Sequence, residues 1–287
     1  MRKYLLLIAL ALTCATSYGF SLEATRFHCA DDTVKINRLL AEAKVAGLST
    51  PNQYMLYFGE QLLGTPYVAH TLEGDKEYLT INIDQLDCTT FVETLVALTR
   101  TALQQSPTWY TYAANLERIR YQGGKVDGYA SRLHYISAWI VENSSVGIIR
   151  EVTSIIPNAD SQIKSLYYMS ANRDKYPALA DSATFAAIKK LESGYNMHMS
   201  PLLRKNDLMK KEVIASLQDG DIVCLTTKTE GLDVMHLGIV KFDGKKPHLL
   251  HASSSSKKVV VDKYDLYEML RPMRNCTGVR ILRVTDN

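Results

Sequence analysis

The feature that most constrains the fold is a change in apolar periodicity at Asp219 and Gly220. Before this turn, apolar residues recur three and four positions apart, which is the spacing of helices that bury one face. After it, short β-branched runs alternate with turns, as in antiparallel strands. Helices followed by strands predict an α+β fold whose antiparallel sheet lies in the C-terminal part.

The expected helices cover residues 31–46, 52–63, 88–104, 108–119, 131–142, 161–170 and 182–193. The expected strands cover residues 221–227, 234–242, 247–253, 257–262 and 278–284. The helix at 88–104 has the clearest pattern, with Asp87 in the N-cap position and Pro107 beyond its end. Hydrophobic residues make up 46% and charged residues 22%, a balance that excludes a disordered chain or a coiled coil.

The first 19 residues are predicted to be an export signal. Arg2 and Lys3 precede an uncharged apolar run, and small and polar residues follow through Gly19. The run is about half of the ~20 residues that a membrane-spanning helix needs. We therefore expect an exported protein of the periplasm or cell envelope, with no stable membrane span and one domain at 20–287. Lipid anchoring through Cys14 is an alternative, although the residues before it match a lipoprotein box only loosely.

The charge balance argues against a nucleic-acid binder. The chain has 33 basic and 30 acidic residues, a net charge of +3, whereas nucleic-acid binders normally carry a dense basic stripe. Tyr accounts for 17 aromatic residues against 6 Phe and 2 Trp, which suits a polar ligand as well as a Tyr-rich core. Nucleic acid is therefore not an expected partner.

Cys88 and His236 are the strongest candidates for chemistry. Cys88 stands in the first turn of the clearest helix, where free N–H groups and the helix dipole are expected to lower a thiol pKa. A thiolate also needs a base. His236 is a candidate, since strand alternation places it with Gly238, which would leave space for a helix end or a substrate. His248 and His251 are three apart and so point to opposite faces.

Structural interpretations of the same residues remain open. A cysteine at a helix start, or a histidine on a strand, is more often structural than catalytic. A zinc site would need His236, His251 and a third ligand, but the chain has no Cys-x-x-Cys or His-x-x-x-His pair, so neither metal nor cofactor is expected. Cys224 is expected to be an inert core thiol. Cys29 and Cys276, near the two ends, could form a disulfide.

Four motifs in order carry a resemblance: Leu63-Gly-Thr-Pro-Tyr67, Asp87-Cys88, His236-Leu-Gly-Ile-Val240 and His251-Ala-Ser253. Together they resemble the NlpC-type papain-like cysteine peptidases of bacterial cell walls. The longer stretch Leu86–Thr94, with Ser131-Arg-Leu-His-Tyr135 downstream, resembles a narrower branch, the N-acetylmuramoyl-L-alanine amidase-like family. The resemblance implies a papain-like core, with the nucleophile at a helix N-terminus packed on the antiparallel sheet.

The resemblance also implies catalytic roles. Cys88 would attack an amide carbonyl, His236 would act as base and then as acid, and His251 would orient His236. The oxyanion would be bound by the Cys88 N–H and, unless Tyr67 is structural, by the Tyr67 hydroxyl. The expected substrate contacts are Arg132, His134, Tyr135 and Ser253, and Arg132 suits a carboxylate of a stem peptide.

The implied substrates are muropeptides, cleaved between N-acetylmuramate and L-Ala, with 1,6-anhydro forms favoured. A γ-D-glutamyl–diamino-acid endopeptidase is the enzymatic alternative, and a non-catalytic muropeptide-binding module is the alternative of another class. The nucleophile motif Asp-Cys-Thr-Thr-Phe departs from the usual Asp-Cys-Ser-Gly-Phe. A mainly helical insert around residues 105–215 is expected to form a wall over the cleft, and the protein is expected to be a monomer.

Overall fold

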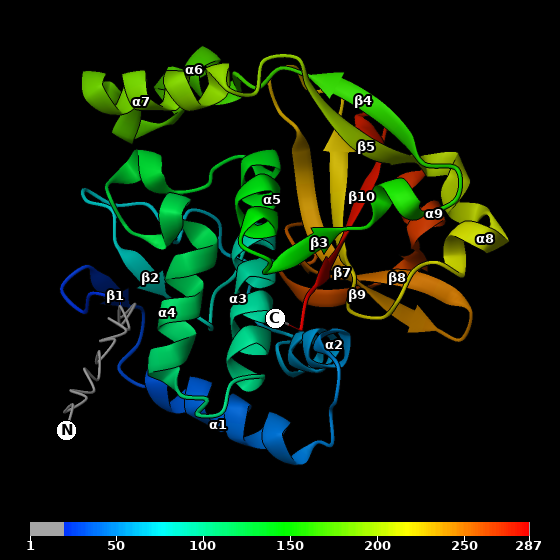
Figure 1. The fold of residues 1–287 in the computed structure, drawn as a ribbon, viewed down its shortest axis with the longest axis horizontal. Coiled ribbons are helices and arrows are strands. Elements are labelled where there is room, and N and C mark those ends of the chain that lie inside the picture. The colour runs from blue at the N-terminus through cyan, green and yellow to red at the C-terminus, as the bar shows by residue number, and fades with distance from the viewer. Residues whose placement is uncertain (1–19, 287) are drawn as a thin grey trace, which may run out of the picture.

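The computed structural model describes residues 20–286, so the predicted export signal and Cys14 lie outside the described residues. A layer of helices packs beside an antiparallel sheet (Figure 1). The layer consists of α1 (Asp32–Val45), α2 (Pro51–Gln61), α3 (Cys88–Ala102), α4 (Trp109–Arg120) and α5 (Ile136–Ser145). The α+β prediction is confirmed.

The main sheet has eight strands among the described residues, and all of its pairings are antiparallel. Its order is β4-β5-β10-β6-β7-β8-β9, and β3 also pairs with β10. The strands are β3 (Ile149–Glu151), β4 (Asp160–Lys164), β5 (His198–Arg204), β6 (Ile222–Thr227), β7 (Val234–Asp243), β8 (Lys246–Ser253), β9 (Lys258–Asp265) and β10 (Cys276–Val284). A separate parallel pair joins β1 (Thr25–Phe27) to β2 (Leu79–Ile81).

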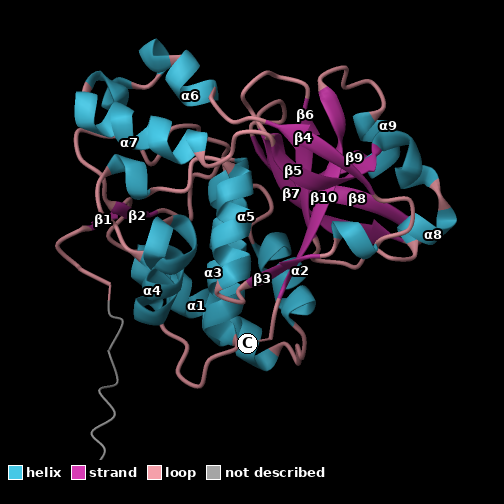
Figure 2. Cartoon of the chain, turned by 45° about the horizontal axis from the view of Figure 1, so that its top comes forward, coloured by secondary structure: helices cyan, strands magenta, loops and turns pink. Residues whose placement is uncertain are grey.

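Helix α3 lies at the centre of the molecule, between α4 and the sheet (Figure 2). Its apolar residues Phe91, Leu95 and Leu98 are fully buried against α2, α4, β7 and β8. A capping box begins the helix: Asp87 Oδ1 accepts the Thr90 N–H at 2.8 Å, and Thr90 Oγ1 accepts the Asp87 N–H at 2.9 Å. The cap determines where α3 begins.

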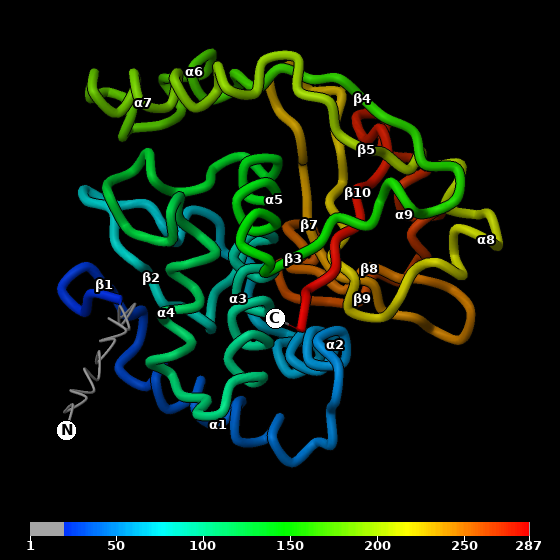
Figure 3. Tube along the Cα trace, in the orientation of Figure 1, coloured from blue at the N-terminus to red at the C-terminus, as the bar shows by residue number. Residues whose placement is uncertain are grey.

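Both faces of the sheet are covered. Leu237, Ile239 and Leu250 join the core shared with the helical layer. Val240 and Leu249 belong to a second core on the other face, which α9 (Leu266–Leu270) and η6 (Lys205–Met209) cover together with the short helix α8 (Lys211–Ile214). The chain returns at its C-terminal end to the helical layer, where β10 contacts α2 (Figure 3).

The helix expected at 161–170 is wrong. Residues 160–164 form β4, which pairs with β5 along five residues, and only α6 (Tyr168–Ala171) is helical. The side chain of Ile163 is 59% exposed, so the apolar repeat there does not mark a buried helix face. The strands β1 to β5 were not expected because four of them have three to five residues and β5 contains Pro201.

The segment 105–215 is only partly the expected helical insert. It contains α4 to α8, including α7 (Ser182–Ser193), and the 3₁₀ turns η1 (Gln122–Gly124), η2 (Tyr129–Ser131), η3 (Thr153–Ile155), η4 (Arg173–Lys175) and η5 (Pro177–Ala180). It also supplies β3, β4 and β5 to the main sheet. In residues 20–286, no helix combines the length and hydropathy that a bilayer crossing requires.

Candidate active site

Cys88 is the first residue of α3 and is partly buried. Three donors approach its sulfur: the backbone N–H of Leu237 on β7, the Thr89 hydroxyl and the backbone N–H of Cys88 itself. Because α3 contacts β7 and β8, the start of the helix lies against the strand that carries His236. Between residues 20 and 286, no hydrogen bond joins the Cys88 sulfur to a histidine, and the strand donor at the sulfur is the backbone N–H of Leu237.

His236 on β7 and His251 on β8 form a hydrogen-bonded pair. His236 Nε2 lies 2.6 Å from His251 Nδ1, and the rings meet edge to face with centroids 4.8 Å apart. His251 is buried and His236 partly buried. Since Nε2 of His236 is taken by His251, Nδ1 is the nitrogen that remains for a thiol or a substrate. The structure therefore brings the predicted base and its predicted partner together.

Gly238 makes this pairing sterically allowed. A Cβ built at Gly238 would lie 2.8 Å from Leu250 O and 2.9 Å from His251 Cβ, distances too short for real contacts. The expectation that Gly238 leaves space for a helix end or a substrate is thus wrong. The neighbouring strand β8 fills that space, and the missing side chain lets His251 reach His236.

Burial controls the electrostatics of the candidate pair. It raises the pKa of the Cys88 thiol to about 11, aided by the negative charge of Asp87, and the three nearby donors offset this only in part. Burial and the neighbouring His251 lower the pKa of His236 to about 3. Against the expectation of a lowered thiol pKa, the resting pair at neutral pH is a thiol and a neutral imidazole. A low-dielectric site at the helix start outweighs the helix dipole here.

Tyr67 lies beside the nucleophile candidate. Its backbone N–H donates to Lys257 O at 2.9 Å, which fixes the segment after Pro66 against the chain that leads into β9. Burial is the main cause that raises the pKa of the Tyr67 phenol, and the ionisable groups of Cys88 and Asp87 raise it further. Tyr67 also pairs with Leu86, two residues before Cys88. Its role as an oxyanion donor stays a prediction.

Ser253, at the end of β8, is buried and bonded within its own turn. Its hydroxyl oxygen lies 3.0 Å from Ser255 Oγ and accepts the Ser256 N–H at 3.2 Å. These contacts close the turn between β8 and β9. A substrate contact by Ser253 stays a prediction.

Arg132 is committed to internal contacts. Its guanidinium lies 2.8 Å from Glu73 Oε1 and 3.4 Å from Glu77 Oε1, and it stacks over the Tyr129 ring at 4.8 Å. The Arg132 side chain is only 8% exposed. A substrate carboxylate would have to displace two carboxylates already in place, so the geometry favours a structural ion-pair role over the expected one.

His134 and Tyr135 also bond internally. A ring nitrogen of His134, Nε2, lies 2.8 Å from Tyr129 O, and burial, reinforced by the Arg132 charge, lowers the pKa of His134 to about 3. The Tyr135 hydroxyl donates to Glu192 Oε1 at 2.7 Å and accepts the Met169 N–H at 2.9 Å. These contacts hold α6 and α7 to the start of α5, and none of them reaches Cys88 or His236.

One group of donors could hold a metal ion in the part of the chain that the structure describes: His28, Cys29 and Asp84, whose ligand atoms lie within 4.8 Å of one another. Lys35 Nζ already lies 2.6 Å from Asp84 Oδ2, and burial raises the pKa of the Cys29 thiol. The cluster is accordingly explained as an ion pair beside a neutral thiol. Cys29, Cys88, Cys224 and Cys276 are all free, and Cys224 is fully buried in β6, as expected.

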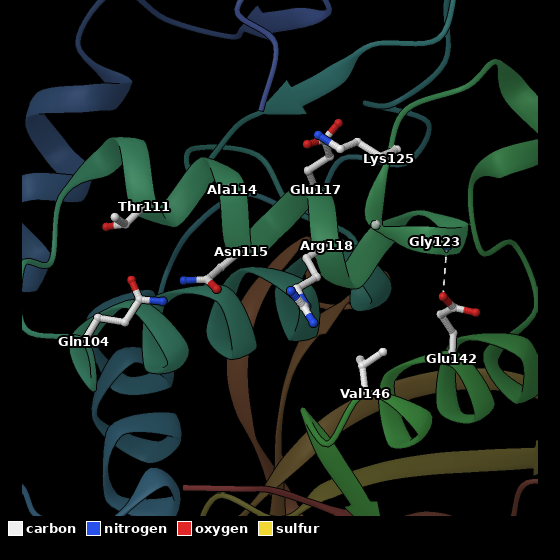
Figure 4. Close-up of a pocket in the computed structure, with 11 residues that line it drawn as sticks. Gln104, Thr111, Ala114, Asn115, Glu117, Arg118, Gly123, Lys125, Glu142 and Val146 are labelled. Carbon is white, nitrogen blue, oxygen red and sulfur yellow. Dashed lines mark hydrogen bonds between the residues drawn. The ribbon is translucent and has the colours of Figure 1, made fainter. Parts of the chain in front are cut away.

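A hollow of about 410 Å³ lies between α4 and α5 (Figure 4). Gln104 lines it just beyond the C-terminal end of α3, whereas Cys88 stands at the N-terminal end. Arg118 and Glu142 also line it, and Glu142 Oε1 accepts the Gly123 N–H at 2.9 Å. This hollow is therefore separate from the candidate active site.

Asp262 is a residue that the sequence analysis did not single out. Its Oδ2 lies 3.9 Å from His251 Nε2, on the side of the ring away from His236. An acidic residue inside the β-branched run Val259–Asp262 was the only available signal, and such residues are common on strand surfaces.

Solved structures of other proteins share the fold of this chain. The chain resembles the crystal structure of an N-acetylmuramoyl-L-alanine amidase from Bacteroides uniformis, with 41% identity, coverage of 83% of this chain and 100% of that chain, and a TM-score of 0.78. A Bacteroides fragilis protein provisionally named a xylanase is 42% identical, with coverage of 80% and 100% and a TM-score of 0.76. A Legionella pneumophila protein shares the fold at 20% identity, with coverage of 88% and 94% and a TM-score of 0.66. Among curated proteins, none matches.

The family follows from the sequence itself. The N-acetylmuramoyl-L-alanine amidase-like family model matches residues 57–278, and the chain belongs to this family. The resemblance of Leu86–Thr94 and Ser131–Tyr135 to this family is thereby confirmed, and the papain-like placement of the nucleophile stays a prediction. The family match extends over α3, the whole segment 105–215 and the strands that carry His236 and His251.

Proposed function

We propose that the protein is a cysteine-dependent N-acetylmuramoyl-L-alanine amidase that acts on peptidoglycan fragments. The observation that carries this is the His236–His251 hydrogen bond, made through Nε2 of His236 on the strand whose Leu237 N–H approaches the Cys88 sulfur. A histidine with one nitrogen held and the other left for a nearby thiol is the arrangement that nucleophilic catalysis needs. Family membership and the Bacteroides amidase support the choice of substrate bond.

In the first half-reaction, His236 Nδ1 takes the thiol proton as the sulfur bonds to the carbonyl carbon of the lactyl amide. The carbonyl π electrons move to oxygen, where the Cys88 N–H and the Tyr67 hydroxyl stabilise the oxyanion. When the oxyanion collapses, the C–N bond breaks and His236 gives its proton to the L-Ala amine. The product that stays on the enzyme is a thioester.

In the second half-reaction, water gives a proton to His236 Nδ1 as its oxygen attacks the thioester. Collapse releases the N-acetylmuramate carboxyl group, and the sulfur recovers its proton from His236. Because the resting pair is neutral, the transfer of the thiol proton to His236 accompanies S–C bond formation rather than precedes it. The transfer of the water proton to His236 likewise accompanies O–C bond formation. Burial raises the pKa of the Cys88 thiol to about 11, which favours this coupling at neutral pH because little thiolate is present.

The favoured substrates are small soluble muropeptides that end in the 1,6-anhydro sugar. The protein would be exported and would bind them in the periplasm or cell envelope. The support is the family, together with the long segment 105–215 that joins the helical layer to the sheet. A monomer without metal or cofactor is sufficient for this chemistry. The xylanase name of one relative would require a pair of catalytic carboxylates, and the chemistry here is built on sulfur and imidazole.

The test is mass spectrometry of digests of purified muropeptides, in reducing and 1,6-anhydro forms. Free disaccharide plus an intact peptide beginning with L-Ala is the expected result, faster for the anhydro form. A disaccharide that retains L-Ala-γ-D-Glu would establish the endopeptidase instead.

The control is Cys88→Ser, which should remove essentially all turnover while substrate binding remains. The thiol-to-hydroxyl change keeps the size of the side chain but removes the stronger nucleophile. A Cys88→Ser protein that kept a tenth of the wild-type rate would contradict the mechanism. Tight binding of muropeptides by the wild type with no turnover would indicate the binding module.

A further inference from the structure

The ring nitrogen of His251 that faces away from His236 is Nε2, and its protonation state depends on its surroundings. His251 Nε2 is buried and forms no hydrogen bond within residues 20–286, while Asp262 Oδ2 faces it at 3.9 Å. The side chain of His251 is 5% exposed and that of Asp262 23% exposed, so the carboxylate sits at the edge of the buried pair. This buried ring nitrogen has no hydrogen-bond partner and faces a carboxylate, which suggests that the carboxylate determines whether the nitrogen carries a proton.

A neutral imidazole carries one proton, so the pair has two possible arrangements. In the first, His236 donates from Nε2 to His251 Nδ1, which leaves Nδ1 of His236 bare and puts the His251 proton on Nε2. In the second, His251 donates from Nδ1, and the His236 proton then sits on Nδ1. Only the first arrangement leaves His236 able to accept the thiol proton.

The negative charge of Asp262 favours the first arrangement. A carboxylate is an acceptor only, so a proton on the facing His251 Nε2 is stabilised and a bare lone pair there is disfavoured. Burial lowers the pKa of His251, and Asp262 opposes that effect. The titratable groups that act on His251 are His236 on β7 and Asp262 on β9.

The local fold holds this carboxylate in place. Between the pairs His248–Asp265 and Leu250–Val261, one residue of β8 faces three residues of β9, so Asp262 begins a bulge. Asp262 Oδ1 accepts the Tyr264 N–H at 2.9 Å, and Asp262 O lies 3.0 Å from His248 Nδ1. Bulges next to active sites commonly redirect one side chain, and here Oδ2 is the oxygen left for His251.

We propose that Asp262 is a positioning residue that acts through His251 to keep Nδ1 of His236 unprotonated. The proposal rests on the proposed cysteine amidase function. Asp262 touches neither substrate nor sulfur in this assignment. It selects the tautomer of a hydrogen-bonded pair.

The kinetic test compares Asp262→Asn with Asp262→Ala on the same muropeptide. The Asn amide can still accept the Tyr264 N–H, but it presents N–H groups to His251 Nε2 and so favours the wrong tautomer. We expect Asp262→Asn to lower kcat by about tenfold or more with KM nearly unchanged, and Asp262→Ala to lower it less. A merely structural role would produce the reverse order, because Ala loses the contact with Tyr264. Lys263→Ala, an exposed change in the same bulge, is the matched control.

The second readout does not depend on activity. Nitrogen-15 NMR of the histidine rings should place the protons on Nε2 of both His236 and His251 in the wild type, and on Nδ1 of both in Asp262→Asn. A wild-type proton on His251 Nδ1, or no change in Asp262→Asn, would overturn the proposal. A wild type that cleaves no muropeptide would instead contradict the proposed function, and the ring spectra would still decide the tautomer.

Discussion

Cys88 illustrates at the residue scale how burial can oppose a local sequence signal. The first turn of α3 supplies N–H groups that favour a thiolate, yet the thiol also lies next to Asp87 and inside the contact between α3 and β7. Desolvation of a charged group in such a place is larger than the gain from a few dipoles. The nucleophile candidate is therefore held as a thiol until a proton acceptor and an electrophile are both present.

Alkylation of Cys88 by iodoacetamide should be slow at neutral pH. The thiol pKa is raised to about 11, so the thiolate fraction is small at pH 7 and increases as the pH approaches 11. Alkylation rates of Cys88 measured by mass spectrometry should rise throughout from pH 7 to 10. At pH 7, the thiol of free glutathione should react faster than Cys88. The Cys29→Ser variant removes the other partly exposed thiol of residues 20–286 as a control. A rate that levels off below pH 8 would show a lowered thiol pKa.

The three histidines near the site should differ in a defined order. His236→Ala should remove nearly all turnover, His251→Ala should lower it less, and His248→Ala should keep most of it. The His248 ring is hydrogen-bonded to the backbone oxygen of Asp262, and the loss of this bond should lower the free energy of unfolding by about 1 kcal/mol. Urea unfolding and steady-state kinetics check both quantities. Equal kinetic losses at His248 and His251 would contradict the assignment.

The contact between β7 and β8 is the decisive feature at the element scale. Strand alternation alone places His236 on one strand face, but the pairing of two strands brings a second histidine within hydrogen-bond distance. Gly238 permits this because a side chain there would overlap β8. The site is thus assembled across a strand pair, and the N-terminal start of α3 packs against it.

Gly238→Ala should damage the site and the sheet together. The new Cβ would meet Leu250 O and His251 Cβ below 3.0 Å, so the strands must separate. We expect a loss of about 1–3 kcal/mol in the free energy of unfolding and a large fall in kcat. Gly74→Ala is the matched control, since the nearest atom there is the flexible end of Arg26 at 3.2 Å. Thermal unfolding and activity measured on the same preparations provide the comparison, and equal behaviour of the two variants would contradict it.

At the scale of the whole molecule, internal polar networks join the helical layer, the segment 105–215 and the sheet. Arg120 pairs with Glu93 at 2.6 Å and donates to Thr80 O at 2.8 Å, which connects α4, α3 and β2. Arg280 on β10 pairs with Glu151 at 2.7 Å and donates to Ser137 on α5 at 2.9 Å. Removing one partner of such a buried ion pair lowers the free energy of unfolding by about 3–5 kcal/mol, so these contacts determine how the layers pack together.

Buried neutral histidines should make the protein less stable in acid. The pKa of His134 is lowered to about 3 in the folded state, below its ordinary value of 6.5, so the unfolded chain binds a proton that the folded chain does not. This contribution to stability is present above pH 6.5 and is lost as the pH falls toward 3. The free energy of unfolding of His134→Gln should therefore change less between pH 7 and 4 than that of the wild type. Exposed His28→Gln is the control, and identical curves for His134→Gln and the wild type would contradict the assignment.

The sequence by itself determined the α+β layout, the start of α3 and the family, because these depend on local signals. Apolar periodicity, the Asp87 cap and short motifs around Cys88, His236 and His251 can each be recognised within a few residues. The helix assigned to 161–170 failed for the same reason, since pairing with β5 outweighed its local pattern.

The tertiary structure alone decided the protonation and the partners of the site. Solvent exclusion around Cys88 depends on the packing of α3 against β7, and it reversed the pKa expected from the helix start. Arg132 was expected to face a substrate, but the loop that carries Glu73 and Glu77 neutralises it. Asp262 reaches His251 only through a bulge set by strand register. Desolvation, charge pairing and register each arise between segments distant in sequence, and no local pattern records them.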